Sequence, residues 1–214
     1  MKKLYSFRPW NDVAKGIFNG RSVLVLDKEE GGKLYAMGYY GRPLSVYKPK
    51  EKEISSEIEL SPVEALYLAK TGALEVYRGE RKLSWEELEN ELRKDINNFR
   101  ELYMVYEDLK SKGYIVKPGM KFGADYAVYE YGPGIDHAVF LVHVVLAYDA
   151  FEPEEIVRAG RLSHGVRKRF VMAYPNVSSK KVEYVVFRWV KPRATKGRRA
   201  SPFRAGRGSV SWAI

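Results

Sequence analysis

The chain has 214 residues, no cysteine and a formal net charge of +10. This length permits one large or two small domains with a substantial core, while the lack of cysteine excludes disulfide bonds and thiolate metal sites and favours a reducing compartment. No apolar run approaches the roughly 20 residues of a membrane span, and the N-terminus lacks the apolar core of a signal peptide, so we expect a soluble cytoplasmic protein with no membrane partner.

The first 83 residues predict a small α/β domain. Its predicted strands are residues 22–27, 33–40 and 74–77, and a Glu-Glu-Gly-Gly turn at residues 29–32 separates the first two. The sequence Ser-Pro-Val-Glu from Ser61 begins a predicted helix, because Ser caps the helix, Pro suits its first position and Glu reaches back to the cap. This helix is expected to end near Lys70.

A second capping box, Ser-Trp-Glu-Glu from Ser84, predicts a helical region that reaches Lys112 and terminates at Gly113. Residues 95–98 divide this region. Beyond it, glycine turns separate three β-prone runs within residues 113–145, and the last run is almost wholly apolar, as expected of a central strand. A further helix is predicted at residues 153–165, and further strands are predicted at residues 170–174 and 182–190.

These elements predict an α+β fold. We expect an N-terminal domain at residues 1–83, a C-terminal mixed-sheet nuclease domain flanked by helices at residues 84–192, and a flexible basic tail at residues 193–214. The segment from Lys191 to the end of the chain carries seven Lys or Arg and no acid. Such a concentration of positive charge favours a polyanionic partner such as a nucleic acid, although it also suits a solvated tail.

Three side chains of the C-terminal half suit metal-independent RNA cleavage. When the 2′-hydroxyl of RNA attacks its own phosphate, one group must take the hydroxyl proton, one must protonate the leaving 5′-oxygen, and a cation must stand beside the developing charge. Tyr129 and His137 follow one another across a glycine turn, and antiparallel strands there would bring both to one edge of a sheet. Lys168 supplies the cation and would lower the pKa of a tyrosine base. Either ring suits either proton transfer.

Each of these residues also has an ordinary interpretation. Tyr129 is one of 16 tyrosines and suits a packed core, while Lys168 suits a solvated surface. His143, within the apolar run, is typical of a core histidine with a satisfied hydrogen bond, and His164 near a helix end is typical of a dipole partner. A metal-dependent nuclease would have Asp125 and Glu130 as its carboxylates, but these face opposite sides of one strand.

Three segments together resemble the tRNA-splicing endonuclease family of archaea and the catalytic subunits of the eukaryotic enzyme. They are Gly-Tyr-Ile-Val-Lys-Pro-Gly-Met-Lys-Phe-Gly-Ala-Asp-Tyr-Ala-Val-Tyr (113–129), Asp-His-Ala-Val-Phe-Leu-Val-His-Val (136–144) and Ser-His-Gly-Val-Arg-Lys (163–168). With their flanks they cover about residues 85–192, in the family's order. The resemblance implies a catalytic triad of Tyr129, His137 and Lys168. It also implies a cut of precursor tRNA at a bulge-helix-bulge, without metal or other cofactor, that leaves a 2′,3′-cyclic phosphate and a 5′-hydroxyl.

The same resemblance implies that two cationic or aromatic side chains hold a flipped bulge base. Arg161, seven residues before Lys168, matches one of these places, and Arg188 or Trp189 is expected to supply the other. Stacking on a guanidinium or an indole suits unpaired RNA bases and contributes roughly 1–3 kcal/mol per base. The ordinary interpretation is a helix-surface charge for Arg161 and a core aromatic for Trp189.

One segment departs from the family's pattern. Members that assemble from identical chains carry an acidic loop between the last two long strands, which docks into a neighbouring subunit. Here residues 175–181 contain two lysines and no acid. We therefore expect a heterotetramer, in which a second, structural subunit supplies the acidic loop. A non-catalytic RNA-binding role of this chain in such a complex is the alternative, against which the intact Tyr129, His137 and Lys168 argue.

Overall fold

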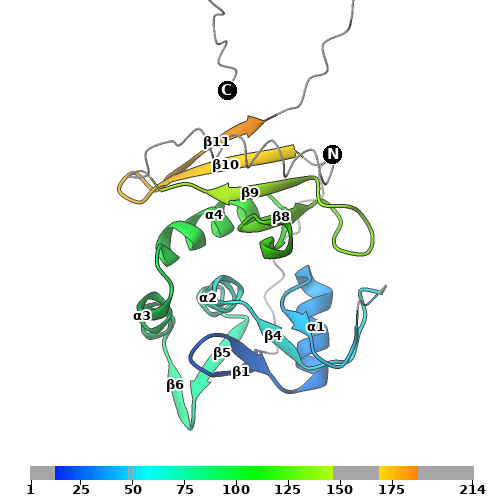
Figure 1. The fold of residues 1–214 in the computed structure, drawn as a ribbon. Helices are drawn as coiled ribbons and strands as arrows, with labels where there is room; N and C mark the ends of the chain where they lie inside the picture. The colour runs from blue at the N-terminus through cyan, green and yellow to red at the C-terminus, as the bar shows by residue number, and fades with distance from the viewer. Residues whose placement is uncertain (1–12, 48, 50, 147–168, 188–214) are drawn as a thin grey trace, which may run out of the picture.

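The computed structural model describes residues 13–47, 49, 51–146 and 169–187. The helix predicted at residues 153–165 and the basic tail lie outside these ranges. Within them the chain forms an α+β fold with two mixed sheets, one from each half of the sequence (Figure 1).

The N-terminal sheet has the strand order β3-β4-β2-β1-β5-β6. Its strands are β1 (Ala14–Phe18), β2 (Val23–Val25), β3 (Arg42–Pro43), β4 (Ile58–Leu60), β5 (Leu74–Arg78) and β6 (Arg81–Leu83). The central pair, β1 and β5, is parallel, whereas the other neighbours are antiparallel. The alternating burial along β1 leaves Lys15 and Ile17 exposed, so one face of this sheet is turned to solvent.

Three helices pack with this sheet. They are α1 (Lys28–Gly38), α2 (Pro62–Lys70) and α3 (Trp85–Asp95), of which α1 contacts β1, β2 and β4 while α2 contacts β5 and α3. Both predicted capping boxes are present: the carboxylate of Glu64 accepts from the backbone of Ser61, and that of Glu87 accepts from the backbone of Ser84. The helix predicted to end near Lys70 and the division of the next helical region are confirmed.

The strand predicted at residues 33–40 is wrong, since these residues belong mainly to helix α1. The carboxylate of Asp27 accepts hydrogen bonds from the backbone of Glu29 and Glu30 and so begins a helix where a turn was expected. The two glycines that suggested the turn serve close packing instead. A Cβ atom placed on Gly31 or Gly32 would lie 2.3 Å from the carbonyl oxygen of Ser56 or 1.9 Å from that of Ile54.

The C-terminal sheet has the strand order β11-β10-β9-β8-β7. Its strands are β7 (Ile115–Pro118), β8 (Tyr126–Tyr129), β9 (Phe140–Val144), β10 (Arg169–Asn176) and β11 (Lys181–Phe187). The pair β9 and β10 is parallel and the other neighbours are antiparallel. The short 3-10 helix η1 (Met120–Phe122) follows β7. This mixed sheet confirms the fold predicted for the C-terminal half.

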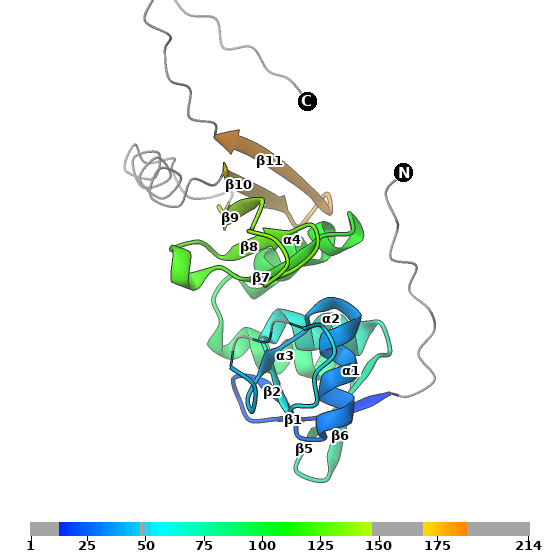
Figure 2. The ribbon, with the colours of Figure 1, turned by 90° about the vertical axis from the view of Figure 1, so that its right-hand side faces the viewer.

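Helix α4 (Phe99–Ser111) joins the two sheets. It contacts β7, β9, β10 and β11 of the C-terminal sheet and α2 and α3 of the N-terminal half, and Figure 2 shows it under the C-terminal sheet and above α2 and α3. One apolar cluster continues through this layer, from Leu66 of α2 to Val128 of β8 and Val171 of β10. The two halves therefore share one core.

Candidate active site

The end of β8 and the starts of β9 and β10 lie side by side at one end of the C-terminal sheet, here called the site edge. Val128, near the end of β8, lies opposite Phe140, the first residue of β9, and Phe140 lies opposite Arg169, the first residue of β10. Because β8 is antiparallel to β9 whereas β9 and β10 are parallel, the chain leaves β8 at the edge where it enters β9 and β10. Tyr129 ends β8 at this edge, and His137 lies in the connection between β8 and β9.

Tyr129 is a buried residue with 7% of its surface exposed. All four residues of β8 are buried, and they alternate between two apolar clusters: Tyr126 and Val128 belong to the shared core, whereas Ala127 and Tyr129 pack with Tyr35. Burial, followed by the negative charge of Asp136, raises the pKa of the Tyr129 phenol. These surroundings favour the protonated phenol, so a tyrosine base at this position requires a nearby cation.

The connection from Tyr129 to His137 is organised by the carboxylate of Asp136. Its oxygens accept hydrogen bonds from the backbone N–H groups of Glu130, Tyr131 and Gly132 at 3.2, 3.2 and 2.9 Å. Glu130 directly follows Tyr129, and Asp136 directly precedes His137. The carboxylate therefore closes residues 130–136 into a compact loop, here called the site loop, and joins the positions beside the two candidate residues. His137 itself is exposed.

Sequence reasoning missed this role of Asp136. An Asx-type carboxylate that bonds backbone N–H groups within a glycine-rich loop is a recognisable local pattern, and Gly132-Pro133-Gly134 followed by Asp136 carries it. The signal was present, but Asp136 served only as part of the resemblance. Its observed hydrogen bonds show that it holds the loop's shape.

His143, in β9, and Asp125, directly before β8, form a pair that is separate from the site loop. The Nδ1 atom of His143 lies 2.8 Å from Oδ2 of Asp125, and the same carboxylate oxygen accepts the backbone N–H of Val144 at 2.8 Å. His143 therefore has a hydrogen-bonding partner, as predicted. The carboxylate of Asp125 is engaged in these contacts, and Glu130 is exposed. Within the described ranges no cluster of three or more His, Asp or Glu side chains is placed to hold a metal ion.

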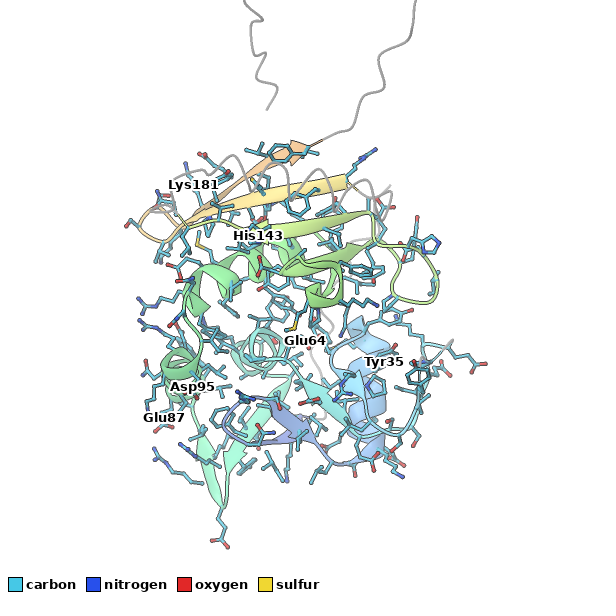
Figure 3. The ribbon with its side chains drawn as sticks, viewed as in Figure 1. Tyr35, Glu64, Glu87, Asp95, His143 and Lys181 are labelled. Carbon is cyan, nitrogen blue, oxygen red and sulfur yellow. The ribbon has the colours of Figure 1, made fainter. Side chains whose placement is uncertain are left out.

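A buried ion pair lies between the two sheets, where Figure 3 labels Glu64. Nζ of Lys117, on β7, lies 2.7 Å from Oε1 of Glu64, on α2, and the Glu64 side chain is 2% exposed. Burial alone raises the pKa of Glu64, but the charge and hydrogen bond of Lys117 and the hydrogen bonds from Ser61 outweigh it and lower the pKa below its usual range. Sequence analysis assigned Glu64 only to a helix cap and gave Lys117 no role.

The remaining predicted site residues lie outside the described residues. These are Lys168 of the predicted triad and the predicted base-holding residues Arg161, Arg188 and Trp189. Arg169, the residue after Lys168, is described and is exposed at the start of β10. In the part of the chain that the structure covers, no helix is both long and apolar enough to cross a bilayer.

Comparison with known proteins gives matches along most of the chain. A model of the tRNA intron endonuclease N-terminal domain matches residues 14–89, and a model of the tRNA intron endonuclease catalytic C-terminal domain matches residues 99–184. The similar proteins include a tRNA-splicing endonuclease of Hyperthermus butylicus, 43% identical over 84% of this chain and all of the relative. Those of Sulfurisphaera tokodaii and Saccharolobus islandicus are 42% identical over 79% of this chain and 94% of the relative, and 41% identical over 84% of this chain and all of the relative.

Proposed function

The chain belongs to the tRNA intron endonuclease family, and from that premise we propose that it is the RNA-cleaving subunit of a tRNA-splicing endonuclease that cuts precursor tRNA at a bulge-helix-bulge. The observation that supports this proposal best is the common edge of β8, β9 and β10. Tyr129 ends the first of these strands, the site loop leads from it through His137 to the second, and Lys168 directly precedes the third. This common edge supports the proposal of one site that combines Tyr129, His137 and Lys168.

We propose that Tyr129, His137 and Lys168 carry the reaction without a metal ion. One of the two rings takes the proton of the 2′-hydroxyl, whose oxygen attacks the adjacent phosphorus. The bond from phosphorus to the 5′-oxygen breaks, and the other ring protonates that oxygen. The products are a 2′,3′-cyclic phosphate and a 5′-hydroxyl, so no water is consumed. Lys168 stabilises the charge on the phosphate oxygens and offsets the burial and the Asp136 charge that raise the pKa of Tyr129.

Recognition of the RNA is assigned to cationic and aromatic side chains of the C-terminal half of the sequence. We propose that Arg161 holds one face of a flipped bulge base and that Arg188 or Trp189 holds the other. Residues 193–214 contain six Lys or Arg and are proposed to form a basic tail that adds affinity for phosphates without choosing the cut site. The proposed domains are thus an N-terminal domain at residues 1–83 and a catalytic domain at residues 84–192, followed by the tail.

The chemistry is tested with a prefolded bulge-helix-bulge substrate in excess EDTA. The enzyme is this chain together with whichever chain co-purifies with it from the native source, and the product ends are analysed chemically. We expect cleavage with 2′,3′-cyclic phosphate and 5′-hydroxyl ends. A 3′-hydroxyl product, or cleavage that is lost in EDTA and restored by magnesium, would contradict the mechanism. A complex that binds but never cuts the substrate would support a purely structural role for the chain.

We also propose a second, related subunit, with two copies of each chain in the complex. The turn between β10 and β11 is exposed and carries Lys180, and Lys181 begins β11 directly after it, so this segment lacks the negative charge that a basic docking pocket requires. Two cut sites related by approximate twofold symmetry suit an assembly with two active centres. The purified single chain is expected to be a dimer or smaller and nearly inactive by light scattering and cleavage assay. A fully active tetramer of this chain alone would refute the mixed assembly.

A further inference from the structure

The backbone of the site loop lies against an aromatic ring of the N-terminal half. A Cβ atom placed on Gly132 would lie 2.3 Å from Cε2 and 2.6 Å from Cζ of Tyr39. Gly132 has a φ of +124°, which disfavours any other residue even where space is available. Glycine is thus required here for two reasons, its backbone angle and the ring that occupies the place of a side chain. The contact joins the site loop directly to the residue that follows α1.

Tyr39 is held in an uncommon conformation. It is the C-terminal cap of α1, with a left-handed φ of 57°, and its backbone N–H donates to the carbonyl oxygen of Tyr35. A non-glycine residue in this region costs of order 1–3 kcal/mol and persists only where its surroundings fix it. Here only 2% of the Tyr39 surface is exposed, and the ring of Tyr35 packs edge-on against it with 5.2 Å between centroids.

Lys117 fixes the main chain at Tyr39 and just after it. Its Nζ atom donates to the carbonyl oxygens of Tyr39 and Gly41 at 2.6 and 2.9 Å, besides its ion pair with Glu64. Glu64 in turn accepts the backbone N–H of Gly41 at 3.2 Å. The buried ion pair between the sheets therefore sets where Tyr39 stands. Without Lys117, the two carbonyl oxygens lose this donor, and the buried Glu64 carboxylate keeps the hydrogen bonds from Gly41 and Ser61 but loses its countercharge, which is costly in a low dielectric.

From these contacts we infer that Tyr39 is a positioning residue for His137. Its ring presses on Gly132 from the side of the N-terminal half, while the Asp136 carboxylate draws the backbone of residues 130–132 together. The loop is thus fixed at two points, and His137 emerges directly after Asp136. A second close approach, 3.4 Å from a Cβ placed on Gly134 to the carbonyl oxygen of Pro49, supports the loop from the same side.

This inference rests on the proposed function for its effect on cleavage, but the positioning itself is measurable without RNA. The test compares Tyr39→Leu with Tyr39→Phe, which keeps the ring. The matched control is Tyr40→Leu, because Tyr40 is the next residue, is also buried, and stacks instead on Tyr67 with 6.2 Å between centroids. Both leucine variants lose a buried ring of the same size, but only one of those rings touches Gly132.

We expect Tyr39→Leu to lower the single-turnover cleavage rate of the complex roughly 10- to 100-fold, the usual consequence of misplacing a catalytic group by about 1 Å. Its RNA dissociation constant should stay within about twofold of wild type, and Tyr39→Phe should restore the rate. Tyr40→Leu should leave the rate unchanged at temperatures well below unfolding. Equal rate losses in the two leucine variants would show a general effect of core damage and overturn the inference.

The second measurement is the side-chain NMR signal of His137 in the protein without RNA, assigned by its loss in His137→Ala. Tyr39→Leu should move this signal, whereas Tyr40→Leu and Tyr39→Phe should leave it in place. An unmoved signal in a folded Tyr39→Leu protein would overturn the inference even if cleavage were slow. If the wild-type complex fails to cut RNA but the signal moves as expected, the proposed function fails and the positioning of His137 by Tyr39 stands.

Discussion

The two sheets use their surface charges differently. On the N-terminal half, four exposed cations pair with neighbouring carboxylates, namely Arg42 with Glu59, Arg78 with Glu91, Arg81 with Glu87 and Lys82 with Glu75, whereas Lys15, Arg21 and Arg93 are exposed and form no ion pair with another described residue. On the C-terminal sheet, Arg169, Lys180 and Lys181 are exposed and form no ion pair with another described residue. Surface pairs add little stability, but each one neutralises a cation. From this contrast we expect Arg169 to contribute more to RNA binding than the paired cations of the N-terminal half, which is tested below.

The two halves also differ in their proposed roles, since the C-terminal sheet carries proposed catalytic residues and the N-terminal half carries residues that hold them in place. The C-terminal sheet carries Tyr129 and His137 at an edge, whereas the N-terminal half contributes Tyr39 and Glu64 to the interior below that edge. Loss of the exposed His137 should therefore lower the rate at nearly constant stability, whereas loss of the buried Glu64–Lys117 ion pair should lower stability. The four predictions that follow test this division from the largest expected effect to the smallest.

The largest effect is expected for His137→Ala. The substitution removes a proton-transfer group, so single-turnover cleavage should fall by about 10²–10⁴-fold, while RNA binding and thermal stability stay close to wild type because His137 is exposed. The control is His143→Gln, which disturbs the pair with Asp125 and should act mainly on stability. Cleavage by His137→Ala within tenfold of wild type would remove His137 from the proposed triad.

The next effect concerns the buried ion pair. Glu64→Gln leaves Lys117 without its carboxylate, and breaking such a pair from one side typically costs about 3–5 kcal/mol of unfolding free energy. Glu91→Gln is the control on the outer surface, where Glu91 contacts Arg78 and Lys94, and should cost no more than about 1 kcal/mol. Denaturant unfolding of both variants measures the difference. Equal losses would contradict the assignment of support to the interior.

How far the sequence predicts this molecule depends on how local each signal is. Capping boxes are read within four residues, and the helices that begin at Ser61 and Ser84 lie where they were predicted. Helix α1 was missed because Gly31 and Gly32 suggest a turn until the backbone of residues 54–56 packs against them. That contact is tertiary, and it overrides the local preference of glycine.

The same argument applies to the site. The order strand, turn, strand predicted that Tyr129 and His137 flank one glycine-rich connection, and the strand register agrees with this arrangement. The support could not be predicted, because Glu64 and Lys117 are 53 residues apart in sequence and Tyr39 reaches Gly132 from the other half of the molecule. Neither contact can be recognised from the spacing of apolar and polar residues along the sequence. The capping side chains, which act within a segment, were predicted, whereas Asp136 was missed despite its local hydrogen bonds, and the side chains that act between segments were not predicted.

The third prediction concerns Lys110, which lies in the interior beside the ion pair. Burial lowers the pKa of Lys110 to about 8, and Lys117 adds to this effect while Glu64 opposes it. The rings of Tyr40 and Tyr67 lie 4.5 and 6.0 Å from Nζ of Lys110. Between pH 8 and 10 the unfolded chain retains a proton that the folded protein has released, so the free energy of unfolding should rise with pH, by at most about 1.4 kcal/mol per unit.

Lys110→Met removes this titrating group and should flatten the rise. Denaturant unfolding at pH 7.5, 8.5 and 9.5 compares the variant with wild type, and Lys94→Met on the exposed surface serves as the control with an unchanged slope. A slope that is the same in wild type and Lys110→Met would show that Lys110 keeps its proton in the folded protein.

The smallest effect is expected for Arg169→Ala. Arg169 stands at the site edge beside Phe140, and loss of one phosphate contact should reduce the slope of log K against log salt by about one unit on duplex RNA segments, judged from the behaviour of duplex DNA. Arg81→Ala removes a cation that is already paired with Glu87 and should leave the slope unchanged. RNA binding titrations at four or more salt concentrations measure both. Equal slopes in the two variants would contradict the contrast between the sheets.

The apolar cluster that packs against both sheets determines how cooperatively the protein unfolds. Because Leu66, Val128 and Val171 belong to one continuous core, neither half can open without exposing apolar surface of the other, and heating should melt the described residues in a single cooperative transition. The short connection between α3 and α4 then lies inside one folding unit, although it separates two family domains. Grafting the N-terminal half of a relative onto this chain would replace half of a shared interior, so the residues on both sides of that interior have to be exchanged together.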